Sequence, residues 1–207
     1  MKVLMINGSP KEKGCTYTAL CEVAKALHEA NIETEIVHIG KEPIVGCMSC
    51  GACSKLEGKC VHKDIVNVII EKAAQSDGFV FGSPVHYAAA SGMLTSALDR
   101  AFYAGKTQFE YKVGAAIVSC RRAGATAAFE QINKYFTISN MPIVSSQYWN
   151  MVHGNNPEEV TLDLEGMQTM RVLGKNMAWL LQLIEAGKKA GIALPQKEDR
   201  AFTNFIR

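Results

Sequence analysis

Short apolar runs alternate with amphipathic stretches along most of this 207-residue chain, and this alternation restricts its fold more than any other feature. The apolar runs predict five strands, at residues 2–7, 33–39, 78–82, 113–118 and 143–145. Apolar residues at helical spacing follow the runs, in segments that begin near Thr16, Asp64, Ser91, Phe129 and Met167. Parallel strands need such helical crossovers, which cover both faces of a sheet. The order predicts an α/β protein, with a doubly wound five-stranded parallel sheet in a three-layer α/β/α sandwich.

A single domain at residues 1–187 accounts for the length, because no shift in composition and no internal repeat divides the chain. Residues 40–63 are rich in glycine and show little periodicity, so we expect a long loop inserted after the second strand. After Gly187 the periodicity stops. Residues 188–207 are expected to form a polar tail that contains two phenylalanines.

Charge and hydropathy exclude several classes of protein. The chain has 22 Lys and Arg against 20 Asp and Glu, a net charge of +2, and no basic block, so nucleic acid is not an expected partner. No apolar window approaches the roughly 18 residues of a membrane span, and the first apolar run ends at Asn7, too early for a signal peptide. We therefore expect a cytoplasmic protein that does not bind membranes. Its seven cysteines favour reduced thiols or a metal site over a disulfide framework.

The loop after the first strand, residues 7–18, contains small residues, hydroxyl side chains and a lysine, and it ends at the start of the predicted helix. Free N–H groups and the helix dipole favour an anion there, and Ser9, Thr16 and Thr18 add hydroxyls. The alternative is that Ser9 and Thr16 only cap the helix, but the loop is longer than a cap needs. Pro10 excludes a GxGxxG motif, and no Gly-Lys-Ser/Thr follows. A single phosphate, as in a mononucleotide such as FMN, fits this loop best.

Three further loops follow strands that end at the same edge of the sheet, where ligands of such folds bind. In residues 82–92 the aromatic Tyr87 is surrounded by small residues that would let a flat ring approach the backbone. Residues 119–124 carry two arginines, and residues 147–151 carry Tyr148 and Trp149. Together these loops suggest that a planar ligand is bound.

Three segments carry a resemblance to a known family: KVLMINGSPKEKGCTYTAL, GFVFGSPVHYAAASGMLTSALDR and GAAIVSCRRAG, which span most of residues 1–154. They resemble the flavodoxin-like NAD(P)H-dependent FMN reductases. The resemblance implies that bound FMN takes a hydride from NAD(P)H and passes electrons to a flavin, a quinone or another small acceptor. It names no catalytic residue, because the cofactor does the chemistry. It also implies a homodimer or homotetramer.

The same resemblance implies contacts to FMN by residues of three loops. The phosphate would be held by Ser9, Lys11, Thr16 and Thr18, with Cys15 beside them; the isoalloxazine would be bordered by Pro84, Val85, His86 and Tyr87; its pyrimidine edge would meet Ser119, Cys120, Arg121, Arg122 and Gly124. Lys11, Cys15 and the Val85-His86-Tyr87 run depart from the residues common in the family.

Four cysteines, Cys47, Cys50, Cys53 and Cys60, have the spacing C-x2-C-x2-C-x6-C. Structural zinc usually takes two separated pairs, whereas consecutive x2 steps are typical of ferredoxins. The thiols could also simply pack as small apolar groups. The motif resembles that of the iron-sulfur flavoproteins, which implies a [4Fe-4S] cluster on these cysteines and a ferredoxin-like donor that passes electrons to FMN. The chain would then be an electron carrier; a flavin-binding sensor is a third alternative.

Overall fold

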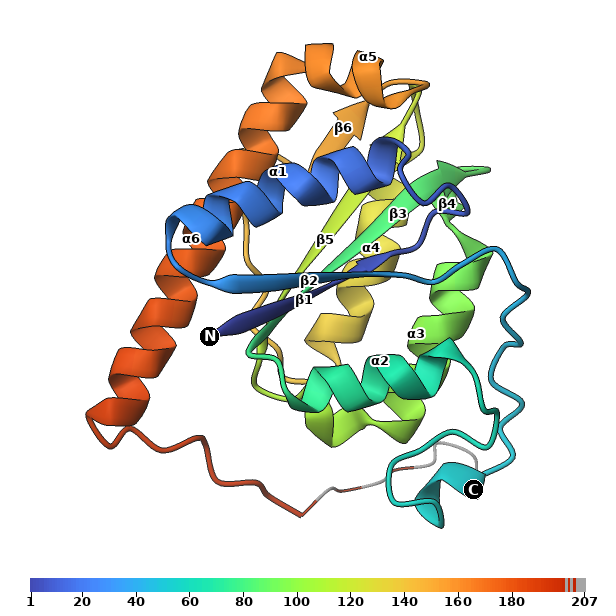
Figure 1. The fold of residues 1–207 in the computed structure, drawn as a ribbon. Coiled ribbons are helices and arrows are strands. Elements are labelled where there is room, and N and C mark those ends of the chain that lie inside the picture. The colour runs from blue at the N-terminus through green and yellow to red at the C-terminus, as the bar shows by residue number, and fades with distance from the viewer. Residues whose placement is uncertain (200, 202, 204–207) are drawn as a thin grey trace.

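Five parallel strands form the central sheet in the order β2-β1-β3-β5-β6 (Figure 1). They are β1 (Lys2–Asn7), β2 (Glu33–His38), β3 (Gly78–His86), β5 (Val113–Cys120) and β6 (Met151–His153). A sixth strand of two residues, β4 (Ala89–Ala90), turns back antiparallel on the end of β3. This computed structural model describes residues 1–199, 201 and 203, so the two phenylalanines expected in the tail lie outside the described residues.

Helices cover both faces of the sheet (Figure 1). On one face lie α1 (Cys15–Glu29) and α6 (Leu164–Lys189), with α5 (Pro157–Leu162) before α6; on the other lie α2 (Ile65–Ala74), α3 (Gly92–Ala104) and α4 (Ala125–Thr137). Two short 3-10 turns, η1 (Ala52–Ser54) and η2 (Lys106–Gln108), complete the elements. Alternate residues of β1 enter the two cores: Val3 and Met5 pack towards α1 and α6, while Leu4 and Ile6 pack towards α2 and α3. The predicted three-layer fold is confirmed.

The predicted fifth strand, at residues 143–145, is wrong. Ile143 forms only an isolated bridge with Gly114, and the fifth strand of the sheet is β6, which pairs with β5 from Val118 onward. Between them the chain leaves the sheet because polar groups bind elsewhere: the Ser146 hydroxyl donates to the Thr169 carbonyl of α6 at 2.7 Å. The outer edge of the sheet is therefore made in two pieces.

The third strand, predicted at residues 78–82, is longer than expected: β3 continues to His86, into the predicted loop, and pairs there with β4. The hairpin turn is only two residues long. Its two residues, Tyr87 and Ala88, have φ angles of 49° and 59°, as a type I′ turn requires.

The long loop expected between β2 and α2 is present, and it contains the short turn η1. From the end of β2 the loop runs past α3 and α2, so that η1 lies away from the carboxyl ends of β1, β3 and β5 (Figure 1). Asp64 caps α2, as predicted, by accepting a hydrogen bond from the Val66 N–H at 3.1 Å.

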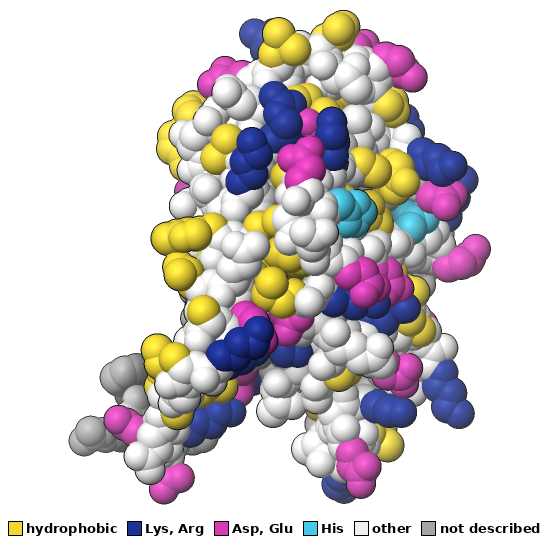
Figure 2. All heavy atoms as spheres, turned by 60° about the vertical axis from the view of Figure 1, so that its left-hand side comes forward, with side chains coloured by type: hydrophobic (Ala, Val, Ile, Leu, Met, Phe, Trp, Pro, Cys, Tyr) yellow, Lys and Arg dark blue, Asp and Glu magenta, His cyan; other side chains and the backbone are white. Residues whose placement is uncertain are grey.

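On the side of the molecule where α6 lies, basic and acidic side chains are mixed with apolar ones (Figure 2). One pair, Arg171 with Glu22 at 2.7 Å, joins α6 to α1. Within the described part of the chain, no helix is at once long and apolar enough to cross a membrane.

Candidate functional site

A cavity of about 310 Å³ opens at the carboxyl ends of β1, β3 and β5. The chain proceeds from β1 to β2 on one side and continues with β3 on the other, so this edge is the switch point of the sheet, where such folds bind ligands. Ten of the predicted cofactor residues line the cavity: Ser9, Lys11, Cys15, Thr16, Pro84, Val85, His86, Ser119, Cys120 and Arg121. Pro10, Gly154 and Asn155 also line it.

The loop after β1 is held by side chains from two strands. Asn7 is fully buried; its amide oxygen accepts from the Ser9 N–H at 3.1 Å, and its amide nitrogen donates to the Glu12 carbonyl at 2.8 Å. His38, at the end of β2, has Nε2 at 2.8 Å from the Ser9 carbonyl, to which it must donate. Sequence reasoning missed the role of His38; its only signal was a polar ring at the carboxyl end of a predicted strand.

The start of α1 is open to this cavity. Gly14 occupies the N-cap without a side-chain hydrogen bond, and the first turn has no acidic residue. The alternative that Ser9 and Thr16 merely cap the helix is therefore wrong. The hydroxyl of Thr16 instead lies 2.9 Å from that of Ser119, and both side chains are buried. Free N–H groups in the first turn of a helix, with hydroxyls beside them, are groups that bind anions in proteins.

Four predicted cofactor residues lie outside the cavity wall. The Thr18 hydroxyl donates to the Gly14 carbonyl at 3.2 Å, and Tyr87 at the hairpin tip is fully exposed. Arg122 is exposed. Gly124 has φ of 85°, and a Cβ on it would lie 2.6 Å from the Ala88 Cα, so Gly124 supports the hairpin instead.

Two thiols of the cavity wall are neutral. Burial raises the pKa of both Cys15 and Cys120 above the ordinary value. The Cys15 Sγ lies 3.6 Å from the Gly154 carbonyl, close to the start of α1. A neutral thiol there adds no negative charge that would oppose a bound anion.

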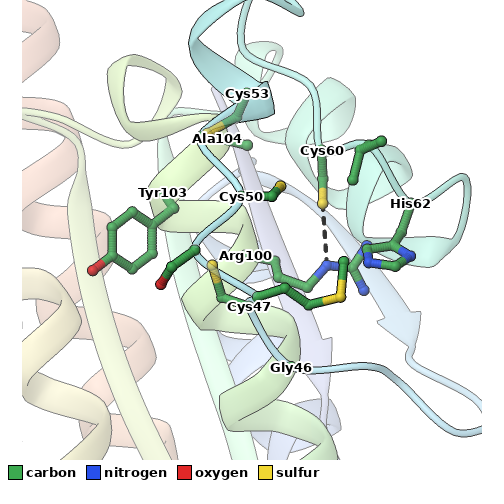
Figure 3. A pocket seen from close by; sticks show the side chains of 13 residues that line it. Gly46, Cys47, Cys50, Cys53, Cys60, His62, Arg100, Tyr103 and Ala104 are labelled. Atoms are coloured by element: carbon green, nitrogen blue, oxygen red, sulfur yellow. Dashed lines mark hydrogen bonds between the residues drawn. The ribbon is translucent and has the colours of Figure 1, made fainter.

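A second cavity, of about 190 Å³, is lined by all four clustered cysteines (Figure 3). Cys47 and Cys50 are exposed, Cys53 and Cys60 are half-buried, and all four are free thiols. Helix α3 forms one wall of the cavity and contributes Arg100, which the dashed line in Figure 3 joins to Cys60. The two cavities share no lining residue.

Two polar residues that the sequence did not single out hold this loop. Asn67 of α2 receives the Cys60 N–H on its amide oxygen at 2.8 Å and donates to the Cys60 and His62 carbonyls at 3.0 and 2.9 Å. Arg100 is 1% exposed and donates to the Cys60 Sγ from Nε at 3.2 Å. The sequence did carry one signal that Arg100 is buried. It lies three residues after Ala97 and one before Ala101, which places it on the buried face of α3.

The four thiols surround a space and do not meet at a point. Among residues 1–199, 201 and 203, no three His, Cys, Asp or Glu side chains come close enough to hold a single metal ion. A [4Fe-4S] cluster takes one cysteine per iron, so its ligands are spread around the cluster. Four cysteines that line one cavity are the donor set that such a cluster takes.

Residues 1–156 match the family of NADPH-dependent FMN reductases. The chain belongs to this family. An iron-sulfur flavoprotein of Methanocaldococcus jannaschii is 34% identical over 194 residues, which cover 89% of this chain and 100% of that protein. An iron-sulfur flavoprotein of Methanosarcina thermophila is 31% identical over 196 residues, which cover 91% of this chain and 99% of the relative.

A flavodoxin from the domain Archaea shares the fold, with a TM-score of 0.60 at 13% identity over 88% of this chain and 99% of that one. The resemblance inferred from the sequence motifs is confirmed by these matches. Like its family, this protein is an FMN-dependent NAD(P)H oxidoreductase.

Proposed function

We propose that this protein binds FMN in the cavity at the carboxyl ends of β1, β3 and β5, with the phosphate on the N-terminus of α1. The observation that carries the proposal is the open first turn of α1 beside the buried Thr16 and Ser119 hydroxyls. Ser9 and Lys11, on the loop clamped by Asn7 and His38, complete the phosphate site. Bound FMN supplies the transfer of a hydride from NAD(P)H and of electrons to a second acceptor.

Other lining residues take the remaining parts of the cofactor. Pro84, Val85 and His86 border the ring, while Ser119, Cys120 and Arg121 meet its pyrimidine edge, where Arg121 supplies a positive charge. Exposed Tyr87 and Arg122 adjoin lining residues in sequence and remain available to the nicotinamide donor or to the acceptor. A flavin, a quinone or a similar small oxidised compound is the class of acceptor that we propose.

A second proposal concerns the cysteine cavity. The four thiols around one space, together with the iron-sulfur flavoproteins among the relatives, support a [4Fe-4S] cluster held by Cys47, Cys50, Cys53 and Cys60. Such a cluster transfers single electrons, so a ferredoxin-like protein becomes the proposed donor, and the protein would act as an electron carrier as well as a reductase. Assembly as a homodimer or homotetramer is proposed from the family resemblance.

The first experiment is the absorption spectrum of protein purified without oxygen, with iron and sulfide assays on the same sample. We expect a flavin spectrum with an added broad iron-sulfur absorbance, and about four irons per chain. Cys50→Ser should lose iron but keep FMN, whereas the matched control Cys21→Ser, on α1, should keep both. A sample that contains flavin but no iron would refute the cluster and leave the proposal of an FMN-dependent reductase standing. A sample that binds no flavin even after addition of FMN would refute both proposals.

The phosphate site is tested by comparing FMN with riboflavin, which lacks the phosphate. Titration of flavin-free protein, followed by quenching of flavin fluorescence, should show FMN binding at least tenfold more tightly. Thr16→Val should reduce this preference, because it removes one buried hydroxyl. Thr18→Val, whose hydroxyl bonds only to Gly14, should change it little. Equal affinities for the two flavins would place the phosphate elsewhere.

A further inference from the structure

Arg100 is the largest fully buried side chain among the described residues, although it carries a charge. It lies on α3 beneath the cysteine loop (Figure 3). A buried guanidinium is costly unless every part of it is paired. Its partners therefore show what this position of α3 is built to do.

Three of the four hydrogen bonds of Arg100 fix the guanidinium in place. Asp64 takes a bidentate pair, from Nη1 at 2.7 Å and from Nη2 at 2.8 Å, and the Val45 carbonyl accepts from Nη1 at 3.1 Å. Although burial opposes its ionisation, the Arg100 guanidinium and the Val66 N–H hold the pKa of Asp64 below its ordinary value. Asp64 is thus a charged partner, and it also caps α2.

The fourth bond is the one that concerns the cysteines. With Nη1 and Nη2 held by oxygen atoms, the remaining Nε–H is directed at the Cys60 Sγ, 3.2 Å away (Figure 3). Asn67 fixes the backbone of Cys60 from the other side. Protein groups therefore fix both the Arg100 guanidinium and the backbone of Cys60. Cys47 and Cys50, by contrast, lie on the exposed part of the loop.

We propose that Arg100 is a positioning residue that raises the reduction potential of the iron-sulfur cluster by donating a hydrogen bond to the sulfur of Cys60. The inference rests on the proposed cluster. Hydrogen bonds to cluster sulfurs and nearby positive charge stabilise the more negative, reduced state, and so move the potential upward. Lysine would not replace arginine here, because only the planar fork can bind Asp64 with two nitrogens and still present Nε–H to the sulfur.

The test is a redox titration of the intact protein without oxygen, followed by visible absorbance and electron paramagnetic resonance, with iron counted in each sample. Arg100→Lys keeps the charge near Asp64 but loses the directed donor, so the cluster potential should move to a more negative value. The potential of the flavin in the same sample should not change. Lys112→Gln is the control, because it removes a half-buried cation that bonds to Ala73 and lies outside the cysteine cavity.

A second variant guards against misfolding of the first. Arg100→Met combined with Asp64→Asn removes both charges together, so no unpaired carboxylate is buried, and the amide oxygen of an asparagine can still cap α2. The double variant should also lower the cluster potential. If Arg100→Lys fails to fold, the potential of the double variant is the test of the proposal. An unchanged potential in a variant that retains its iron would overturn the role of Arg100. Absence of iron from the wild-type protein would instead refute the proposed cluster, and the inference with it.

Discussion

At the residue scale, the loop between β1 and α1 is held by two side chains, Asn7 and His38, that do not themselves line the cavity. His38 reaches from β2 to the Ser9 carbonyl, and Asn7 bonds to both Ser9 and Glu12. The loop is therefore shaped before any ligand arrives. Preorganisation of this kind lowers the entropy lost on binding.

Removal of the His38 ring should loosen this loop. We expect His38→Leu to weaken FMN binding by roughly five- to tenfold, the value of one hydrogen bond of about 1 kcal/mol. The affinity for riboflavin should change less, because riboflavin has no phosphate that this loop could bind. His38→Gln, whose amide can donate to the Ser9 carbonyl, should recover part of the loss.

The matched control for this prediction is His28→Leu, which removes a histidine from α1 that bonds to Thr34 at 2.7 Å on the exposed surface. Its FMN affinity should equal that of the wild type. If His38→Leu and His28→Leu bind FMN equally well, His38 does not shape the phosphate site.

At the scale of elements, the hairpin of β3 and β4 is strained at the cavity. Left-handed backbone costs most residues about 1 kcal/mol or more, yet Tyr87 and Ala88 both adopt it. Gly124, itself left-handed, packs against Ala88 and keeps the turn in place. Strain that persists beside a binding site points to a role for the residue that bears it.

Relief of this strain should stabilise the protein. We expect Tyr87→Asn combined with Ala88→Gly, the residues that a type I′ turn favours, to increase the free energy of unfolding by about 1 kcal/mol. If Tyr87 serves the flavin or its co-substrate, the KM for NAD(P)H or the FMN affinity should worsen at the same time.

Tyr111→Asn provides the comparison, since Tyr111 also has a positive φ, of 61°, but lies outside the FMN cavity. It should raise stability without affecting FMN or NAD(P)H. A loss of stability in the hairpin variant would contradict the assignment of backbone strain to Tyr87 and Ala88.

At the scale of the whole molecule, α1, on whose N-terminus we propose that the phosphate binds, packs against α6. The two helices approach each other closely at Gly174: a Cβ there would be 2.6 Å from the Ala26 Cβ and 2.8 Å from the Val23 carbonyl. The salt bridge of Arg171 with Glu22 lies along the same contact. We therefore expect a change in this contact to alter the position of α1 at the cavity.

Gly174→Ala should force α1 and α6 apart. We expect a loss of about 1 to 3 kcal/mol in the free energy of unfolding, as for other overpacked cores, together with weaker FMN binding. Gly187→Ala in the same helix has ordinary space around its Cβ, with Ile192 at 3.6 Å, and should stabilise the helix. Thermal unfolding with and without FMN measures both effects, and equal stability of the two variants would contradict the close contact.

Much of the fold could be predicted from local periodicity. A strand buries alternate residues and a helix buries every third or fourth residue, so the pattern can be recognised within a short segment of the chain. The first four strands and the helices after them follow from it, and parallel strands bring the loops at their carboxyl ends to one edge. Most of the ten cavity residues were named by the family resemblance and not by periodicity. Periodicity failed at residues 143–145, where an apolar run makes only one bridge before polar bonds to α6 draw the chain away.

Contacts between distant residues could be seen only in the folded structure. His38 meets a carbonyl 29 residues before it, and Arg100 meets a thiol 40 residues before it. Such pairs depend on strand register and on how helices lie against loops, which no local pattern encodes. The chemistry of each loop can be read along the chain, but which side chains hold and tune that chemistry is decided by tertiary packing.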